Sequence, residues 1–368
     1  MKFEINFQKL KEAIQLVERV ANKHLTLQVL SCILIEVKKN IAIFKATNLD
    51  IGIEVSIPIK SSVEGVVAVP GHIISSFVSQ VYDQNQIVKI ETASGNLTIS
   101  AGKSKGVIKT IPSEDFPSIP QVSGGQEADL TTDMFVKGLK SVWYSSSVSN
   151  VKPELSSVYI YRDGDFLVFA ATDSFRLAEK KIKVPLVSKM GDILIPFKNI
   201  PDVIKVLEMM GETVTVAMNK NLISFKARDI YVVSRVIDGV FPDYRQIIPK
   251  GYATEAVVLK QDLLNALKIS NIFSDKFNQI HLTIDPKGKI FQIQTKNSDV
   301  GENVTNVDAA LTGDKVEINF NYRYISDCFQ SIDADSVSLQ FGGMNRPMVI
   351  RPVSGDQTFM YLAMPMNR

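Results

Sequence analysis

The sequence offers few residues that could carry catalysis or hold a metal ion. Histidine, the side chain used most often as a general base, occurs only at His24, His72 and His281. None of them has a second histidine or a cysteine at a spacing typical of metal ligands, so each is expected at the surface or in a turn. The cysteines Cys32 and Cys328 lie far apart in apolar surroundings and are expected to be reduced and buried. We therefore expect no metal site and no cofactor.

Two other stretches resemble parts of catalytic motifs without meeting their requirements. Residues 101–106, Ala-Gly-Lys-Ser-Lys-Gly, contain the end of a phosphate-binding loop, but Leu97 stands where the first glycine is needed and a strand is predicted to follow. The carboxylates Asp163 and Asp165 flank a glycine between two apolar runs, which is typical of a hairpin turn. The sequence thus proposes no reaction, although an enzyme remains one alternative.

The composition is that of a globular chain long enough for several cores. Of the 368 residues, 45% are apolar and 22% are charged, and the formal net charge is only +2. So small a net charge predicts no strong field directed at nucleic acid or membrane. No eighteen apolar residues run together, and no basic start precedes an early apolar run. We expect a cytoplasmic protein.

The predicted elements recur three times, with a period of about 125 residues. A strand followed by a helix is predicted in "FEINFQKLKEAIQL", "ADLTTDMFVKGLKSV" and "VVLKQDLLNALKIS". A second such unit repeats in step, in "VVAVPGHIISSFV", "DILIPFKNIPDVIKVL" and "KVEINFNYRYISDCF". Between the two units, alternating strands end near Thr47, Thr172 and Thr295. Three markers in the same register predict three copies of one α+β domain.

Stretches rich in proline and glycine mark the joints between these copies. They lie at about 113–129 and near 238–254, and each contains a Phe-Pro pair, at residues 116–117 and 241–242. The predicted domains are therefore 1–120, 129–247 and 250–368, each with two helices.

The triplication and three motifs together resemble the bacterial sliding clamp family, the β subunits of DNA polymerase III. The motifs are "ATDSFRLA" at 171–178, "DGVFPDYRQIIP" at 238–249 and the terminal "YLAMPM". This resemblance covers the whole chain and implies three DNA-clamp domains, each with two helices and two antiparallel sheets. It implies a head-to-tail homodimer that closes as a ring around double-stranded DNA. The implied function is that of a processivity factor without a catalytic site.

The resemblance also implies partners and the residues that meet them. The partners are the polymerase III α subunit, a separate ATP-driven clamp loader and other proteins that carry a short clamp-binding motif. DNA would be held without sequence preference, since many base and phosphate contacts would brake sliding. The alternative is that the helix lysines are merely solvated. The DNA-contacting candidates, from helices and connecting loops, are His24, Lys103, Lys105, Lys137, Lys140, Lys198 and Lys205.

Matching positions place a peptide-binding groove between the second and third domains. Methionine suits such a groove because its flexible thioether repacks around different partners. The deep half would be lined by Leu155, Thr172, Ser174, Phe175, Arg176, Leu177, Pro242, Ile247, Leu362 and Met364. The shallower half would be lined by Asn321, Tyr324, Met344, Pro347, Ala363, Pro365 and Met366. The alternative for Met364 and Met366 is that they only complete the sheet of the third domain.

Ring closure would join the first domain of one copy to the third domain of the other. Ile272 and Phe273, at the end of a predicted helix, are expected to lie opposite Ile108 on an edge strand of the partner. The rival interpretation is a monomeric three-domain enzyme or scaffold with a central cleft for a small molecule. A measurement of the mass in solution distinguishes the two.

Overall fold

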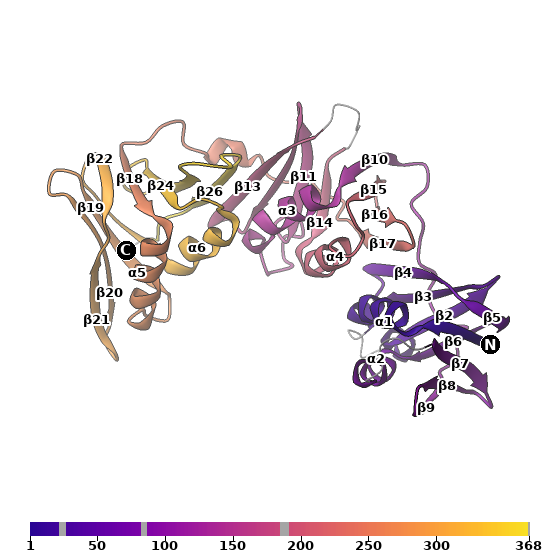
Figure 1. Cartoon of the computed structure of the whole chain (residues 1–368). Coiled ribbons are helices and arrows are strands. Elements are labelled where there is room, and N and C mark those ends of the chain that lie inside the picture. Colours follow the sequence, from indigo (N-terminus) through magenta and orange to yellow (C-terminus); the bar gives the residue numbers. More distant parts are fainter. Residues whose placement is uncertain (22–26, 82–86, 185–190, 367–368) are drawn as a thin grey trace. The chain divides into compact units, whose positions relative to one another are not determined.

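The structure is a computed structural model that describes residues 1–21, 27–81, 87–184 and 191–366. The chain forms two compact units (Figure 1). One consists mainly of Met1–Asp133 and Lys198–Val236, and the other mainly of Met134–Leu186 and Ile237–Arg368. Each unit is described by itself below.

The predicted threefold repeat of strand and helix units is confirmed. The first repeat contains β1 (Lys2–Asn6), α1 (Phe7–Ala21), β2 (Cys32–Lys38), β3 (Ile41–Thr47), β4 (Ile51–Pro58), β5 (Lys60–Val63), β6 (Gly65–Pro70), α2 (Gly71–Gln80), β7 (Ile87–Ala93), β8 (Asn96–Ala101) and β9 (Ser104–Lys109). The second contains β10 (Gln126–Thr131), α3 (Thr132–Val142), β11 (Ser157–Asp163), β12 (Phe166–Thr172), β13 (Arg176–Lys183), β14 (Ile193–Pro196), α4 (Ile200–Leu207), β15 (Thr213–Met218), β16 (Leu222–Ala227) and β17 (Ile230–Arg235). The third contains β18 (Thr254–Leu259), α5 (Lys260–Ile272), β19 (Gln279–Asp285), β20 (Ile290–Asn297), β21 (Gly301–Asn306), β22 (Ala309–Gly313), β23 (Val316–Asn321), α6 (Tyr322–Asp327), β24 (Ser336–Phe341), β25 (Met348–Pro352) and β26 (Phe359–Ala363).

The helices form because their apolar residues recur at helical spacing and face the sheets. In α1, Leu10, Ile14 and Val17 lie on one face and are completely buried. The close approach of α3 to its sheet requires a small residue, since a Cβ on Gly138 would lie 2.4 Å from the ring of Phe169. Figure 1 shows α1 and α2 side by side in the first unit.

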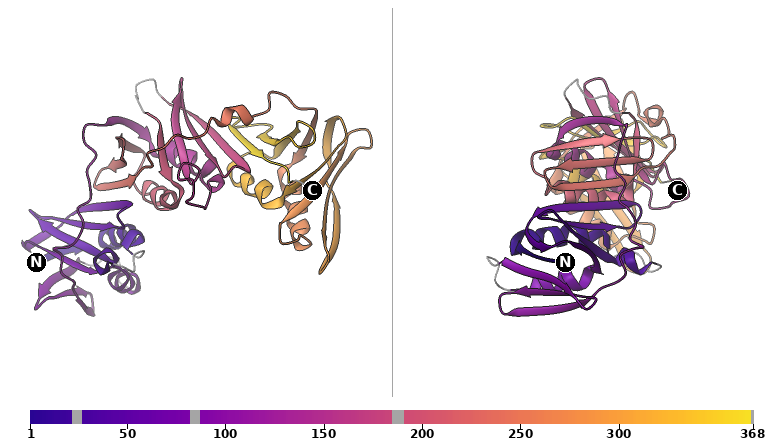
Figure 2. Two further views of the ribbon diagram at one scale, coloured as in Figure 1. Left: turned by 180° about the vertical axis from the view of Figure 1, so that it is seen from behind. Right: turned by 90° about the vertical axis from the view of Figure 1, so that its right-hand side faces the viewer.

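The described strands form four antiparallel sheets, and two of these cross the joints between repeats. An eight-stranded sheet has the order β10-β15-β16-β17-β4-β3-β2-β6, and a nine-stranded sheet has the order β14-β11-β12-β13-β26-β25-β24-β18-β22. The right-hand view of Figure 2 shows pink and salmon strands of the second repeat stacked on indigo and violet strands of the first. The first repeat keeps a five-stranded sheet, β5-β1-β7-β8-β9, and the third keeps a four-stranded sheet, β21-β20-β19-β23.

Both stretches that resembled catalytic motifs are hairpin turns. Asp163 pairs with Phe166 across the β11–β12 turn, where Gly164 has a φ of +59°. The turn between β8 and β9 likewise uses Gly102 at a φ of +59°, and β9 follows it as predicted. Neither stretch is shaped as a catalytic or phosphate-binding site.

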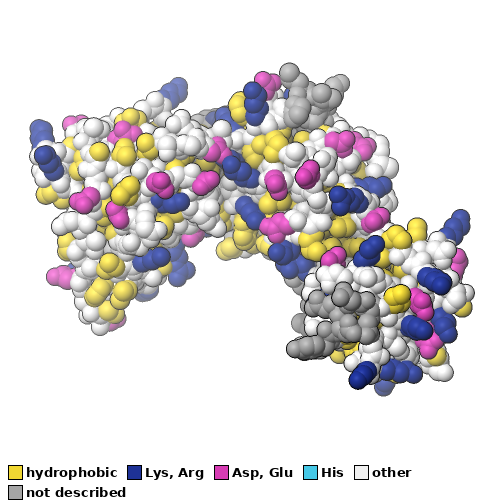
Figure 3. Space-filling view, viewed as in Figure 1, with side chains coloured by type: hydrophobic (Ala, Val, Ile, Leu, Met, Phe, Trp, Pro, Cys, Tyr) yellow, Lys and Arg dark blue, Asp and Glu magenta, His cyan; other side chains and the backbone are white. Residues whose placement is uncertain are grey.

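The two cysteines are buried as expected, and the face shown in Figure 3 carries charges of both signs. Both cysteines are free thiols and are buried. Basic side chains, in dark blue, and acidic ones, in magenta, are interspersed over the face that Figure 3 shows. Among the helices in the described ranges, none is long and apolar enough to span a membrane.

Candidate functional site

The end of the chain is built into the sheet of the second repeat. β26 pairs antiparallel with β13, so that Leu362 lies opposite Leu177. Beyond β26, the N–H of Met364 donates to the carbonyl oxygen of Phe175 at 2.8 Å. The N–H of Met366 donates to a carbonyl oxygen of β23, also at 2.8 Å. Residues 359–366 are therefore held by backbone hydrogen bonds to the second and third repeats.

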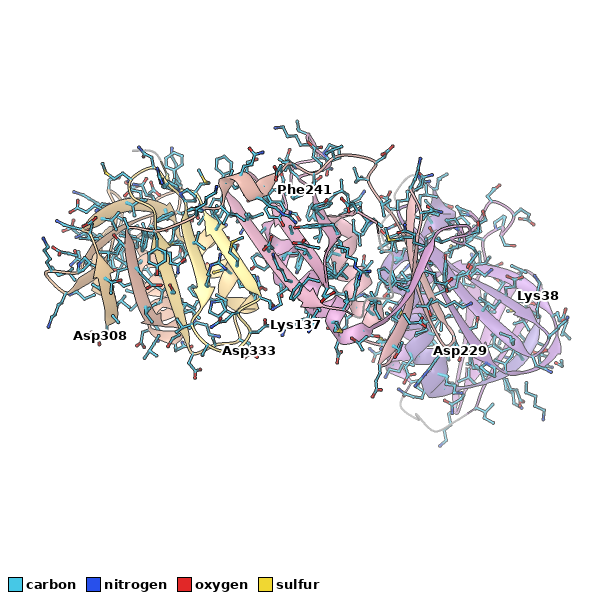
Figure 4. The ribbon with its side chains drawn as sticks, turned by 90° about the horizontal axis from the view of Figure 1, so that it is seen from above. Lys38, Lys137, Asp229, Phe241, Asp308 and Asp333 are labelled. Atoms are coloured by element: carbon cyan, nitrogen blue, oxygen red, sulfur yellow. The ribbon has the colours of Figure 1, made fainter. Side chains whose placement is uncertain are left out.

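An apolar cluster lies beneath the paired strands β13 and β26. It is formed by the second and third repeats and by the connector between them, residues 236–253. Leu177 and Leu362 have no exposed surface and lie in the buried layer of this cluster. The connector contributes Phe241, which Figure 4 labels. Tyr159, Phe166, Ile237, Ile248 and Met364 pack on the cluster and are partly exposed. The buried members are Tyr161, Val168, Ala170, Leu177, Leu194, Phe241, Tyr244, Val349, Met360 and Leu362.

A chain of hydrogen bonds ties the connector to β11 and β13. The hydroxyl of Tyr244 donates to Oε2 of the buried Glu179 at 2.5 Å and lies 2.7 Å from the hydroxyl of Tyr161. Arg245 donates from Nη2 to the Tyr161 hydroxyl at 2.9 Å and to Asp163 at 3.3 Å. Burial, together with the negative charge of Glu179, raises the pKa of Tyr244, which stays protonated as a donor. Sequence reasoning missed this network, because its members are spread over two strands and the connector.

The hairpin between β12 and β13 presents Phe175 to solvent. The hydroxyl of Thr172 donates to the carbonyl oxygen of Arg176 at 2.6 Å, and Asp173 accepts from the Phe175 N–H at 2.9 Å. Ser174 adopts a positive φ of 78° at the tip. The side chain of Phe175 is 59% exposed as a result. An exposed aromatic ring on a fixed turn is suited to contact with a partner.

Arg176 connects this hairpin to α6. Its Nε donates to Asp173 at 2.9 Å and its Nη1 to Asp327 at 2.6 Å. The guanidinium carbon lies 4.9 Å from the ring centre of Tyr324, which stacks on Phe175 with 6.5 Å between ring centres. The structure thus brings Phe175, Arg176 and Tyr324 into contact with one another.

The remaining groove candidates lie on several elements. Leu155 is buried, and Pro242 and Ile247 are exposed on the connector. The Met344 side chain is 74% exposed between β24 and β25. Three more candidates, Pro347, Pro365 and Met366, are partly buried, and Ala363 is buried opposite Arg176. Asn321 caps α6 by accepting from the N–H of Arg323 at 2.9 Å.

Three of the DNA-contacting candidates are ion-paired. The pairs are Lys137–Asp356 at 2.7 Å, Lys198–Asp50 at 2.6 Å and Lys205–Glu208 at 3.3 Å. Figure 4 labels Lys137 on α3 in the second unit. Such pairing reduces the positive charge that these lysines offer to a phosphate.

The other candidates lie on exposed positions or outside the described residues. Lys103 and Lys105 are exposed at the β8–β9 hairpin, and Lys140 is exposed one helical turn after Lys137. His24 lies outside the residues that the structure describes.

Asp356 is shared by two lysines of the second repeat. Its Oδ2 accepts from Lys137 at 2.7 Å and from Lys180 at 2.5 Å, and Thr358 donates to its Oδ1. Lys180 is 2% exposed. Partial burial alone would raise the pKa of Asp356, but these hydrogen bonds lower it well below its usual value.

The burial pattern of β9 shows which way one interface candidate faces within its own repeat. Ile108 pairs opposite Leu97 and is 5% exposed, so its side chain faces the core of the first repeat. The neighbouring Val107 is 63% exposed, because successive side chains of a strand point to opposite faces. Ile272 is 65% exposed at the end of α5, and Phe273 is partly buried beside it. The exposed apolar residue on this edge strand is therefore Val107.

Comparisons with known proteins cover nearly the whole chain. Models of the N-terminal, central and C-terminal domains of the DNA polymerase III beta subunit match residues 1–120, 129–243 and 245–367. The beta sliding clamp of Bacillus subtilis is 26% identical over 378 residues, with all of both chains covered. That of Synechococcus elongatus is also 26% identical, over 88% of this chain and 87% of the relative.

Solved structures show the same fold. The DNA polymerase III beta subunit of Thermotoga maritima superposes with a TM-score of 0.93 at 25% identity, covering 100% of this chain and 99% of the other. A DNA polymerase sliding clamp of Pseudomonas aeruginosa has a TM-score of 0.93 at 23% identity and full coverage of both chains, which supports the fold alone.

A three-repeat fold with these domain matches defines a non-catalytic clamp subunit of a DNA polymerase. The chain belongs to the DNA polymerase III beta subunit family, and its role is that of a DNA sliding clamp.

Proposed function

We propose that this protein works as a head-to-tail homodimer that encircles duplex DNA, with one peptide-binding groove per protomer between the second and third repeats. Its clamp domains are 1–120, 129–247 and 250–368. The ring is the central part of this proposal, and the strand order is the observation that supports it.

The two joints within the chain are built in the same way. At each joint, the last strand of one repeat pairs with the fourth strand of the repeat before it: β17 with β4, and β26 with β13. The counterparts that remain are β9, the last strand of the first repeat, and β21, the fourth strand of the third repeat. Each lies at the end of its sheet with one neighbour only. If β9 of each copy paired with β21 of the other, two copies would form two further joints of the same kind and the ring would close.

Apolar side chains border both of these edges. Val107 is exposed on β9, and Val304 on β21 is 53% exposed. Ile272 is exposed at the end of α5, which packs on β21. A Cβ on Gly301 of β21 would lie 4.0 Å from the ring of Phe273. Burying these side chains between copies would favour association by removing apolar surface from water. Ile108 would support the edge strand from inside.

Within the ring, DNA would be held by weak contacts to phosphates. The contacting residues are proposed to be His24, Lys103, Lys105, Lys137, Lys140, Lys198 and Lys205. Because several of these lysines share their charge with a carboxylate, the attraction would be weak and would depend on salt and not on sequence. Topology would then hold the protein on DNA while it slides.

The groove would bind short motifs of the polymerase III α subunit, the clamp loader and other replication proteins. An extended peptide that buries one leucine and one phenylalanine would gain ~3–6 kcal/mol before ordering costs. Such affinities are micromolar and allow partners to exchange. All the groove candidates named from matching positions belong to this proposal.

Sedimentation equilibrium tests the assembly directly. A mass near twice 40.8 kDa at micromolar concentration is expected. A monomer under these conditions would contradict the dimeric ring.

A further inference from the structure

The hairpin that leads into β4 has the same hydrogen bonds as the hairpin that leads into β13. The hydroxyl of Thr47 donates to the carbonyl oxygen of Ile51 at 2.8 Å, as Thr172 donates to Arg176 at 2.6 Å. The residue two positions after each threonine has a positive φ, of 73° and 78°. The residue directly after each threonine accepts from two backbone N–H groups at 2.8–3.0 Å. The two joints between repeats therefore share a local geometry.

The strand pairing beyond these hairpins is also equivalent. Gly52 lies opposite Val233, as Leu177 lies opposite Leu362. A backbone hydrogen bond of 2.8 Å closes each seam, from Arg235 to Asp50 and from Met364 to Phe175. Gly52, Val233, Asp50 and Arg235 thus take the places of Leu177, Leu362, Phe175 and Met364.

A hollow of about 390 Å³ opens at this first joint. Its lining includes Thr47, Gly52 and Val233 from the sheet, and Pro117 and Pro120 from the segment that joins the first repeat to the second. Most of these side chains are small or apolar, so the hollow can take one branched aliphatic side chain.

The segment 110–125, which joins the first repeat to the second, is packed firmly enough to form a wall of the hollow. Ile119 is buried with Tyr231 and Val233. A Cβ on Gly52 would lie 2.7 Å from Cγ2 of Ile119, so this close approach requires glycine. The hydroxyl of Tyr231 donates to the carbonyl oxygen of Pro120 at 3.0 Å.

The mouth of the hollow carries an excess of positive charge. The carboxylate of Asp50 is compensated by Lys198, whose Nζ lies 2.6 Å away. Nε of Arg235 donates to the carbonyl oxygen of Leu49 at 2.8 Å, which holds the guanidinium group at the mouth. No carboxylate in the described part of the chain is paired with Arg235. The groove has the neutral Met364 at the equivalent position.

We propose that this joint is a second peptide-binding site. Its occupant is an extended segment of a partner protein in which a leucine-like side chain stands beside a carboxylate. The aliphatic group fills the hollow, and the carboxylate accepts charge-assisted hydrogen bonds from Arg235. This site goes beyond the proposed groove, and its equivalence with that groove is one part of the argument, beside the hollow and Arg235.

Calorimetric titration with two acetylated probe peptides tests the proposal. Both peptides are also amidated at the C-terminus, so that one side chain is their only difference in charge. They are Gly-Leu-Asp-Leu-Gly and its neutral match Gly-Leu-Asn-Leu-Gly, and the protein is the full chain. Arg235→Glu should weaken the acidic peptide at this site about tenfold or more, because an attractive charge becomes repulsive. Ser118→Trp, at an exposed position of the lining, should block the hollow without a change of charge. Arg228→Glu, exposed in the turn between β16 and β17, makes the same charge change as a control and should alter affinity less than about twofold.

The outcomes separate this site from the groove. Deleting residues 364–368 should abolish binding at the groove and leave binding at the first joint unchanged. Arg235→Glu and Ser118→Trp should weaken only the binding at the first joint. If the groove proposal fails, the deletion leaves the peptide titration unchanged, whereas Arg235→Glu and Ser118→Trp still weaken the binding seen in it. If neither variant changes peptide binding, or if Arg228→Glu weakens it as much as Arg235→Glu, the second site is excluded. Equal affinity for the two peptides would contradict the role of Arg235.

Discussion

Leu177 on β13 lies directly opposite Leu362 on β26, and neither side chain is exposed. One leucine belongs to the second repeat and the other to the last strand of the chain. Their pairing makes the C-terminal strand part of the second repeat's sheet, so the proposed groove lies on the joint between the two repeats. Substitutions in this seam are therefore expected to affect both stability and peptide binding.

Deleting residues 364–368 tests the tail. The deletion removes Met364 and Met366 from the wall of the proposed groove but leaves β26 and the edge strands intact. The truncated protein should stay folded and dimeric and should lose binding of a Gln-Leu-x-Leu-Phe peptide in fluorescence anisotropy. Binding as tight as that of the intact protein would mean that the tail only completes the sheet.

Leu177→Ala should weaken the same peptide by about 1–3 kcal/mol, because the floor of the groove loses volume. It should also lower the free energy of unfolding by about 2–5 kcal/mol. Leu282→Ala, which truncates another buried leucine on β19, is the matched control. It should destabilise the protein to a similar degree and leave peptide affinity unchanged. Equal losses of affinity in both variants would show a general effect of destabilisation.

Tyr244→Phe should lower the free energy of unfolding by about 1–3 kcal/mol, because Glu179 would lose a donor in a buried site. Urea denaturation followed by circular dichroism measures this loss. Tyr159→Phe, whose hydroxyl donates to Asp192 at an exposed position, should cost less than Tyr244→Phe. Tyr244→Phe combined with Glu179→Gln should recover part of the stability, since an amide is less costly to leave unpaired than a carboxylate. No difference between the two tyrosine variants would contradict the role of the network.

The pH dependence of stability should report Asp356. Its pKa is lowered in the folded protein, so its stabilisation is complete above its unfolded pKa of about 3.9 and is lost as the pH falls below that value. Asp356→Asn should reduce the free energy of unfolding at pH 7, because the buried Lys180 loses its carboxylate partner. The difference from the unmodified protein should shrink between pH 4 and pH 2 in urea titrations. Asp50→Asn, which breaks a more exposed ion pair, is the control and should have a smaller effect. A difference that is constant with pH would exclude Asp356 as the titrating group.

The proposed interface predicts opposite results for two neighbouring residues of β9. Val107→Glu should yield monomers in sedimentation velocity without loss of fold, as should Ile272→Ala combined with Phe273→Ala. Ile108→Ala should instead destabilise the first repeat by about 2–5 kcal/mol, because its side chain is in the core. Val151→Glu, at an exposed valine away from these edges in sequence, is the control and should remain dimeric. Unchanged dimer for Val107→Glu would exclude this edge as the contact.

The sequence predicted the repeat, the hairpin turn at 163–165 and the strand–helix order, because these follow from periodicity and from turn residues that act over a few positions. It could not predict which residue of β9 faces outward, since a shift of one residue exchanges Ile108 and Val107. Glu179 and Lys180 are neighbours on β13, and both are buried. Because β13 is an inner strand covered on both faces, its sequence does not alternate between apolar and polar residues as a strand with one exposed face does. The pairing of Lys137 with Asp356 spans 219 residues and has no local signal.

Retention on DNA circles tests the central claim most directly. The protein is placed on a nicked circular plasmid by a bacterial clamp loader, washed in high salt and followed by gel filtration before and after the plasmid is cut once. A topological ring should stay on the circle in high salt, where phosphate contacts are screened, and should leave once the DNA is linear. Rapid loss from the intact circle in high salt, or equal retention on circular and linear DNA, would contradict the account.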